Sequence, residues 1–227
     1  MKYSYRFVII TALFVTCLIT ANIIASKLVN FGLFILPAAV IIFPFSYIFG
    51  DVLTEVYGYK EARKVIWLGF LCNLIFVIFA SIGQILPPAS FWVNQPAYEA
   101  ILGYAPRLLL ASFLGYLVGE FANSFVLAKM KILTKGKWLW SRTIGSTVVG
   151  EGLDSAIFIT VAFAGTPLFL GITILWHWLT KTVIEVVFTP VTYAVVNYLK
   201  RTESIDTFDN KTNFNPLKLT ERKTVKQ

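Results

Sequence analysis

Residues 62–86 read ARKVIWLGFLCNLIFVIFASIGQIL, and from Val65 to Leu86 this stretch contains no Lys, Arg, Asp or Glu. A run of roughly 20 apolar residues is long enough to cross the hydrocarbon core of a bilayer as an α-helix. Five further apolar runs lie before and after it, so the chain is expected to be an all-α integral membrane protein with six transmembrane helices. The expected spans are Phe7–Val29, Leu33–Tyr57, Ala62–Leu86, Arg107–Met130, Arg142–Gly165 and Phe169–Leu199.

The composition agrees with a membrane protein. Of the 227 residues, 57% are hydrophobic and 14% are charged, whereas about 25% of the residues in a soluble domain are charged. The formal net charge of +8 could indicate nucleic-acid binding, but the basic residues lie between the apolar runs and in the C-terminal tail, where membrane topology explains them better. Cys17 and Cys72 lie inside apolar runs without metal-ligand or disulfide spacing, and we interpret them as packing residues.

Basic residues alternate between the connections. They occur at the N-terminus, around residues 60–64, around residues 129–142 and in the tail, whereas the connections between these are nearly bare. Because Lys and Arg accumulate on the cytoplasmic side, both termini are expected in the cytoplasm. We expect a transporter domain over residues 1–200 and a polar, disordered cytoplasmic tail over residues 201–227. The bare connection Pro87–Pro106 is rich in aromatic residues and predicts a short interfacial helix or re-entrant segment.

Three spans contain residues that weaken helices. Pro44 and Pro190 each remove a backbone hydrogen bond, and several glycines loosen the fifth span. Since broken helices persist at membrane depth only where protein or a water-filled cavity satisfies the freed groups, helices two, five and six are expected to be interrupted around an internal cavity. Small residues four positions apart, at Ala111–Gly115–Gly119 and Ser146–Gly150, allow close helix approach, either within the chain or in a homodimer.

Lys27 lies near the end of the first span, and further ionisable side chains lie within the second, fourth, fifth and sixth spans. Each costs about 2.5–3.5 kcal/mol at the centre of a membrane helix and therefore normally faces an interior pathway. They recur with other polar residues at a spacing of four, which places each set on one helix face. The stripes are Tyr47–Asp51–Glu55–Tyr59, Ser112–Tyr116–Glu120–Ser124, Thr143–Thr147–Glu151–Ser155 beside Asp154, and Thr173–His177–Lys181–Glu185–Thr189–Tyr193–Asn197. Their convergence on a polar centre would indicate a transporter of a small polar molecule, with surplus acids that bind a cation or hold protons.

Plainer interpretations remain open for some of these residues. The stripes could form a structural polar core in which Lys181 and Glu185 pair to hold helices together. Asp51 and Glu55 lie near a cytoplasmic helix end that water could reach. His177 is more typical of an interfacial or core histidine than of a proton relay.

Motifs for enzymatic chemistry are missing from the sequence. There is no G-x-x-x-x-G-K-[ST] phosphate loop and no H-E-x-x-H zinc motif. Cysteine and histidine do not cluster at metal-ligand spacing. We therefore expect neither an enzyme nor a nucleic-acid-binding protein, with no catalytic residues, no metal site and no cofactor.

The stretch FPFSYIFGDVLTEVYGYKEARKVIWLGF (Phe43–Phe70) resembles the signature of the queuosine-precursor transporter family, inner-membrane proteins related to the vitamin-uptake-transporter group. Its D-x-x-x-E-x-Y-G element with the basic residues that follow is fairly specific. Further segments match in order, and the resemblance extends over nearly the whole chain apart from the tail. They are ANIIASKL (Ala21–Leu28), GEFANSFVLAKMK (Gly119–Lys131), RTIGSTVVGEGLDS (Arg142–Ser155) and KTVIEVVFTPVTYAVVNYLKR (Lys181–Arg201).

The resemblance implies import of the 7-deazaguanine bases preQ0 and preQ1, the cyano and aminomethyl precursors of queuosine in tRNA, across the bacterial inner membrane. A guanine-like edge offers adjacent N–H donors to a carboxylate, and the cationic aminomethyl form would suit surplus acids. The coupling ion would be a proton or sodium. The alternative is a substrate-binding membrane subunit of an ATP-driven uptake system for a vitamin-like base.

The matching motifs supply the residues expected to bind the substrate. Among them, Glu120, Glu151 or Asp154 would accept the N–H edge of the base, while Lys181 and Glu185 would form a pair that orients the site or responds to protonation. The full set is Asn22, Lys27, Asp51, Glu55, Glu120, Asn123, Glu151, Asp154, Lys181 and Glu185, with Tyr47 and Trp176 as candidates for stacking on the ring.

Overall fold

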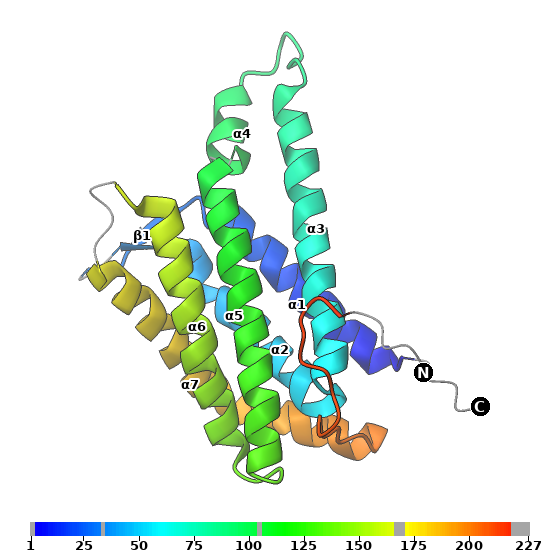
Figure 1. Ribbon diagram of the computed structural model, residues 1–227. Coiled ribbons are helices and arrows are strands. Elements are labelled where there is room, and N and C mark those ends of the chain that lie inside the picture. Colours follow the sequence, from blue (N-terminus) through cyan, green and yellow to red (C-terminus); the bar gives the residue numbers. More distant parts are fainter. Residues whose placement is uncertain (1–2, 33–34, 104–105, 166–170, 219–227) are drawn as a thin grey trace.

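The computed structural model describes residues 3–32, 35–103, 106–165 and 171–218, with only the backbone described for 106–109. Seven α-helices, one 3₁₀ helix and a two-stranded hairpin occur in these ranges (Figure 1). In chain order they are α1 (Tyr5–Ile24), β1 (Leu28–Asn30), β2 (Ile35–Pro37), η1 (Ala38–Ile41), α2 (Phe43–Tyr57), α3 (Tyr59–Ile85), α4 (Gln95–Leu102), α5 (Pro106–Leu133), α6 (Leu139–Phe163) and α7 (Gly171–Glu203).

Six helical segments in the described ranges are long and apolar enough to cross a membrane. Each overlaps one of the spans expected from the sequence, so the all-α class and the number of candidate spans are confirmed. The start expected for the last span, Phe169, lies outside the described residues. The segments are Tyr5–Ile24, Ala38–Tyr57, Tyr59–Ile85, Leu110–Leu133, Leu139–Phe163 and Gly171–Glu203.

The helix α2 lies at the centre of the bundle, where it contacts α1, α3, α5 and α7. In the span Ala38–Tyr57, which comprises η1 and α2, 67% of the most apolar stretch is buried by protein, against 28% in α1 and in α7. The outer faces of the other helices carry exposed apolar side chains, such as Phe79 on α3. A polar stripe on α2 must therefore meet protein rather than lipid.

Glycine allows α5 and α6 to pack side by side with their backbones in contact (Figure 1). A Cβ atom added at Gly119 would lie 3.0 Å from the carbonyl oxygen of Gly150, and one added at Gly150 would lie 2.9 Å from that of Gly119. Gly115 faces the carbonyl oxygen of Asp154 in the same way. The small-residue stripe of α5 thus serves packing within the chain.

The first connection differs from the expected one. The helix α1 is capped by Ser4, whose Oγ accepts from the backbone N–H of Phe7 at 3.1 Å, and it ends at Ile24 rather than near Val29. Antiparallel strands follow, with Leu28 opposite Pro37. Gly32 adopts a positive φ of 87° between them, a conformation that favours glycine.

The interruptions expected in the fifth and sixth spans are wrong. The corresponding helices, α6 and α7, are each continuous through the described residues. A break in α6 would leave backbone N–H and C=O groups without hydrogen-bond partners in lipid. The glycines of α6 therefore remain part of its regular helical hydrogen-bond pattern. Pro190 lies inside α7, which bends without ending (Figure 1). Before α2, η1 ends at Ile41, and Pro44 occupies the first turn of the following helix, where a missing N–H costs little.

The start of α1 and the end of α7 meet at one end of the bundle, here termed the terminal end. Ser4 Oγ donates to Glu203 Oε1 at 2.7 Å, and the Tyr57 hydroxyl donates to Glu203 Oε2 at 2.9 Å. An even number of crossings fits this arrangement. Whether the terminal end faces the cytoplasm stays a prediction from the distribution of basic residues.

Residues 204–218 form no helix or strand, yet they lie along the first turns of α3. Asp209 Oδ2 accepts from the backbone N–H of Tyr59 at 2.9 Å. Arg63 Nη1 donates to the carbonyl oxygens of Asn213 and Asn215 at 2.8 and 2.6 Å. This docked part of the tail differs from the disorder expected from its polar composition, because donors on α3 bind its backbone carbonyls.

Candidate functional site

The polar stripes of α2, α5, α6 and α7 converge in the interior, as their helical spacing predicts. Five carboxyl groups and one ammonium group lie together there, although lipid would penalise each of them separately. Their exposed fractions range from 0 to 4%, and they belong to Asp51, Glu120, Glu151, Asp154, Lys181 and Glu185.

Glycines provide the space for these side chains. A Cβ atom at Gly50 would lie 2.9 Å from Glu120 Oε2, and one at Gly115 would lie 2.7 Å from Asp154 Oδ1. The Tyr47 hydroxyl fills the corresponding position over Gly119. Replacing these glycines with larger residues would therefore push on the acid cluster itself.

Lys181 lies between two acids of α6. Its Nζ atom is 2.5 Å from Asp154 Oδ2 and 2.9 Å from Glu151 Oε2, and it lies 3.9 Å from the centre of the Phe43 ring. The expected pairing of Lys181 with Glu185 is wrong, because both Glu185 oxygens are buried without a hydrogen-bond partner among the described residues. Lys181 therefore pairs with acids of the neighbouring helix α6 and not with the acid one turn away on its own helix.

Asp51, Glu120 and Glu185 have no basic partner within the described part of the chain. Asp51 Oδ1 accepts from Asn123 Nδ2 at 2.7 Å, whereas its Oδ2 is unpaired. Both oxygens of Glu120 are likewise buried and unpaired. The interior thus holds a lysine-paired group of acids on α6 and a lysine-free group on α2, α5 and α7.

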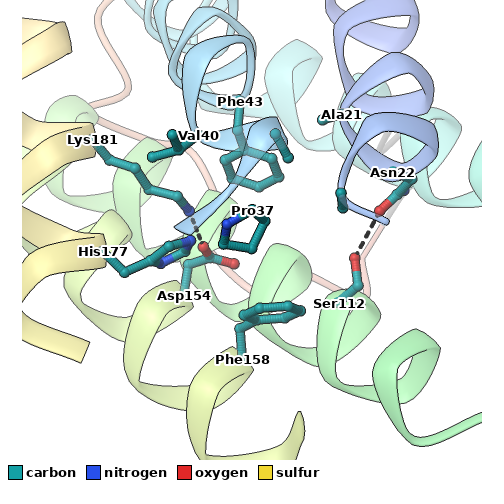
Figure 2. Close-up of a pocket in the computed structure, with 12 residues that line it drawn as sticks. Ala21, Asn22, Pro37, Val40, Phe43, Ser112, Asp154, Phe158, His177 and Lys181 are labelled. Carbon is teal, nitrogen blue, oxygen red and sulfur yellow. Dashed lines mark hydrogen bonds and ion pairs between the residues drawn. The ribbon is translucent and has the colours of Figure 1, made fainter. Parts of the chain in front are cut away.

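A pocket of about 430 Å³, its open mouth included, lies beside the Lys181–Asp154 pair (Figure 2). Asn22 and Ser112 lie on one side of it, and Asp154, His177 and Lys181 lie on the other. Apolar side chains complete the wall. The lining residues are Ala21, Asn22, Ala25, Pro37, Ala39, Val40, Phe43, Ser112, Asp154, Phe158, His177 and Lys181.

Hydrogen bonds fix the polar side chains on both sides of the pocket. Asn22 donates to Asn73 Oδ1 at 2.5 Å and accepts from Ser112 at 2.9 Å. On the other side, His177 Nδ1 lies 2.9 Å from Ser155 Oγ. The pocket is therefore pre-organised, as small-molecule sites usually are.

Two aromatic rings give the pocket flat apolar faces. Phe43 approaches from α2 and Phe158 from α6, where it stacks on the His177 ring at 5.9 Å. Tyr47 is fully buried behind Phe43, with ring centres 5.8 Å apart, and Trp176 is not among the lining residues. Sequence reasoning missed both phenylalanines, although Phe43 begins the quoted signature stretch.

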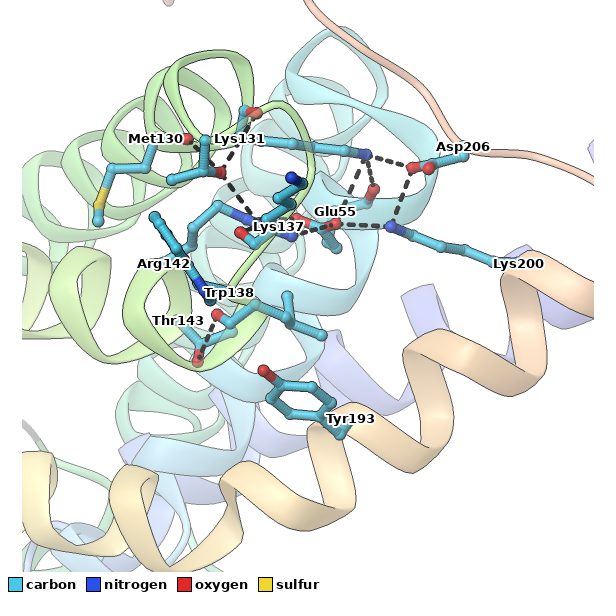
Figure 3. Close-up of polar contacts among 12 residues, drawn as sticks. Glu55, Met130, Lys131, Lys137, Trp138, Arg142, Thr143, Tyr193, Lys200 and Asp206 are labelled. Atoms are coloured by element: carbon cyan, nitrogen blue, oxygen red, sulfur yellow. Dashed lines mark hydrogen bonds and ion pairs between the residues drawn. The ribbon is translucent and has the colours of Figure 1, made fainter.

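Glu55 lies away from this centre, at the terminal end (Figure 3). Its Oε1 is 2.8 Å from Arg142 Nη2 and 2.6 Å from Lys200 Nζ. Asp206 of the tail lies 2.6 Å from Lys131 and 2.9 Å from Lys200. Arg142 is itself buried, with an exposed fraction of 1%.

The structure thus sorts the expected substrate residues. Those gathered in the interior or on the pocket wall are Asn22, Asp51, Glu120, Asn123, Glu151, Asp154, Lys181 and Glu185. Glu55 belongs to the network at the terminal end, and Lys27 is exposed after α1. His177 and Ser112 join the pocket wall, and the polar stripe spacing already contained both.

Known proteins share parts of this sequence. A family model described as "Putative vitamin uptake transporter" matches residues 37–195. A Bacillus subtilis (strain 168) protein named "Probable queuosine precursor transporter" is 40% identical over 117 residues, which is 51% of each chain. A Haemophilus influenzae (strain ATCC 51907 / DSM 11121 / KW20 / Rd) protein of the same name is 26% identical over 121 residues, 53% of this chain and 49% of its own.

The aligned part of this chain spans about half the length of the curated relatives that it matches. No solved structure matches the chain.

Proposed function

Because the chain belongs to the family described as "Putative vitamin uptake transporter", a family of multi-pass membrane transporters, we propose that it imports the queuosine precursors preQ0 and preQ1. Relatives named as queuosine precursor transporters support this substrate class. The observation that carries the proposal is the pocket in which an acid, a lysine and an amide face each other between two aromatic rings. The distribution of basic residues supports a topology with both termini in the cytoplasm, and the bacterial relatives support a location in the bacterial inner (cytoplasmic) membrane.

The pocket suits a flat base with polar edges. The ion pair with Lys181 uses Asp154 Oδ2, which leaves Oδ1 to accept an N–H of a guanine-like edge. The Lys181 ammonium can donate to the carbonyl oxygen of the base, and the rings of Phe43 and Phe158 can cover its faces. Stacking of a base on an aromatic side chain contributes about 1–3 kcal/mol.

The roles proposed for the expected residues follow from their positions. Asn22, Asp154 and Lys181 would contact the substrate, because they line the pocket. Glu151 would hold Lys181 in place at 2.9 Å. Tyr47, packed behind Phe43, would support the aromatic wall rather than stack on the base.

The test is uptake of labelled precursor by purified protein in liposomes without ATP. Asp154→Asn is expected to abolish uptake, while Glu99→Gln, a change at an exposed acid of α4, is expected to leave it at the wild-type rate. Equal transport of guanine would show that the pocket does not select the 7-substituent. Activity that appears only with an added ATPase would support the alternative of a substrate-binding subunit.

A further inference from the structure

We propose that Asp51, Glu120 and Glu185 form a proton-binding site that couples proton movement to transport. The inference rests on the proposed transport function but concerns side chains outside the pocket, since none of the three lines it. The lysine-free acids would thus bind protons, while the pocket binds the substrate.

These acids come from three helices, with α2 in contact with both α5 and α7. Asp51 on α2, Glu120 on α5 and Glu185 on α7 each have an exposed fraction of 0%. They lie close enough to one another to interact electrostatically. The other titratable or charged groups within electrostatic reach of them are Tyr47 from α2, Tyr116 from α5, Glu151 and Asp154 from α6 and Lys181 from α7. Glu55, which lies toward the terminal end on α2, interacts with Asp51.

A buried carboxylate without a partner is costly, because the interior cannot replace the water that it loses. Lys181 compensates at most part of the charge, because its ammonium is already paired with Asp154 at 2.5 Å. The lysine-free acids must therefore be neutralised by protons or by a bound cation. Neutral carboxylic acids are the form that the surrounding helices can accommodate.

The arrangement of oxygen atoms favours protons over a metal cation. Among the described residues, no group of three or more Asp, Glu, His or Cys side chains converges as metal ligands do. The buried Oδ1 of Asn123 and Oδ2 of Asp51 are acceptors without a donor in the described part of the chain. A protonated carboxyl group donates a hydrogen bond, so protons on these acids would supply the missing donors.

Charge links this site to the pocket. With three protons bound, the interior retains the charges of Glu151, Asp154 and Lys181, and a cationic substrate beside Asp154 would balance the remaining negative charge. Each carboxylate takes up one proton to become a neutral acid and releases it on the opposite side of the membrane, with no other bond changed. Because a cationic substrate and these protons repel each other, their coupling requires that the helices rearrange only when the three acids are neutral and the substrate is bound.

A first experiment needs no substrate. Infrared spectra of the purified protein in lipid at neutral pH should show the carbonyl band of protonated carboxylic acids, which carboxylates lack. Glu120→Gln and Glu185→Gln should each remove part of that band, whereas Glu99→Gln should leave it unchanged. A band that neither variant changes would overturn the proposal, and a band lost when sodium is added would overturn it in favour of a cation site.

A second experiment measures coupling in liposomes. An imposed pH gradient should drive precursor accumulation by the wild type, and a lumenal pH dye should report proton entry with the substrate. Glu120→Gln and Glu185→Gln should lose accumulation yet retain exchange of precursor at equal concentrations. Undiminished gradient-driven accumulation in both variants would overturn the proton site, whereas a wild type that transports neither precursor but shows the infrared bands would contradict only the proposed substrate.

Discussion

The Nζ atom of Lys181 on α7 lies 2.5 Å from Oδ2 of Asp154 on α6, although Glu185 lies one turn further along its own helix. This cross-helix pair joins the two helices beside the pocket and places a carboxylate and an ammonium side by side on its wall. It also leaves the acids of α2, α5 and α7 without a lysine. One contact thus separates a substrate-facing part of the interior from an acid-only part.

Removal of Lys181 should be strongly destabilising. Lys181→Met leaves Glu151 and Asp154 as buried acids without a cation, and breaking a buried ion pair by deleting one partner costs about 3–5 kcal/mol. Thermal unfolding of the purified protein in detergent measures the loss. The double variant Lys181→Met/Asp154→Asn should be more stable than the single variant, because it carries one stranded charge fewer. A single variant as stable as the wild type would contradict the buried pair.

The aromatic wall gives a prediction about affinity. Phe158→Ala removes a ring from the pocket and should weaken precursor binding by about 1–3 kcal/mol, the usual cost of removing an aromatic side chain that stacks on a base. Calorimetric titration of the purified protein measures the effect. Phe79→Ala is the matched control, since Phe79 is 68% exposed on the outer face of α3. Equal weakening by both changes would indicate a general loss of folding rather than lost stacking.

The helices and the polar stripes could be predicted from the sequence, because both follow from the periodic spacing of residues. An uninterrupted apolar run determines a span, and a spacing of four places Asp51 or Glu120 on a single face. Since lipid penalises an ionised side chain, the polar face of each stripe had to meet other helices. The convergence of acids was therefore predictable without coordinates.

The ion-pair partners of buried residues could not be predicted from the sequence of a single helix. A spacing of four favoured Lys181 with Glu185, but the rotation and depth of α6 against α7 bring Asp154 closer. In the same way, Glu55 shares the stripe of Asp51, yet Arg142 binds it at the terminal end. Such pairings depend on how neighbouring helices slide past each other, which periodicity does not determine.

Backbone contact between α5 and α6 predicts sensitivity at Gly119. A methyl group there would collide with the Tyr47 hydroxyl and approach Asp154 Cβ to 2.8 Å. Overpacking of this kind costs about 1–3 kcal/mol, so Gly119→Ala should lower the unfolding temperature and reduce uptake. Gly171→Ala is the control, because nothing lies within 4 Å of a Cβ atom added at Gly171. Unchanged stability of Gly119→Ala would show that the helices can separate without cost.

The docked tail should detach at acidic pH. Partial burial alone would raise the pKa of Asp206, but hydrogen bonds from Lys131 and Lys200 outweigh it and lower this pKa below the ordinary value. Because the folded pKa is lowered, the contribution of Asp206 to docking is complete above the unfolded value of about 3.9 and disappears as the pH falls through the lower folded value.

A spin label at Thr212→Cys, in a background without the native cysteines, should stay immobile at neutral pH and become mobile only in strong acid. Asp206→Asn should increase label mobility already at neutral pH and remove the acid transition, because Lys131 and Lys200 then keep only Glu55 as a shared acid. A label that is mobile at every pH in the otherwise unchanged protein would contradict the docked position of residues 204–218.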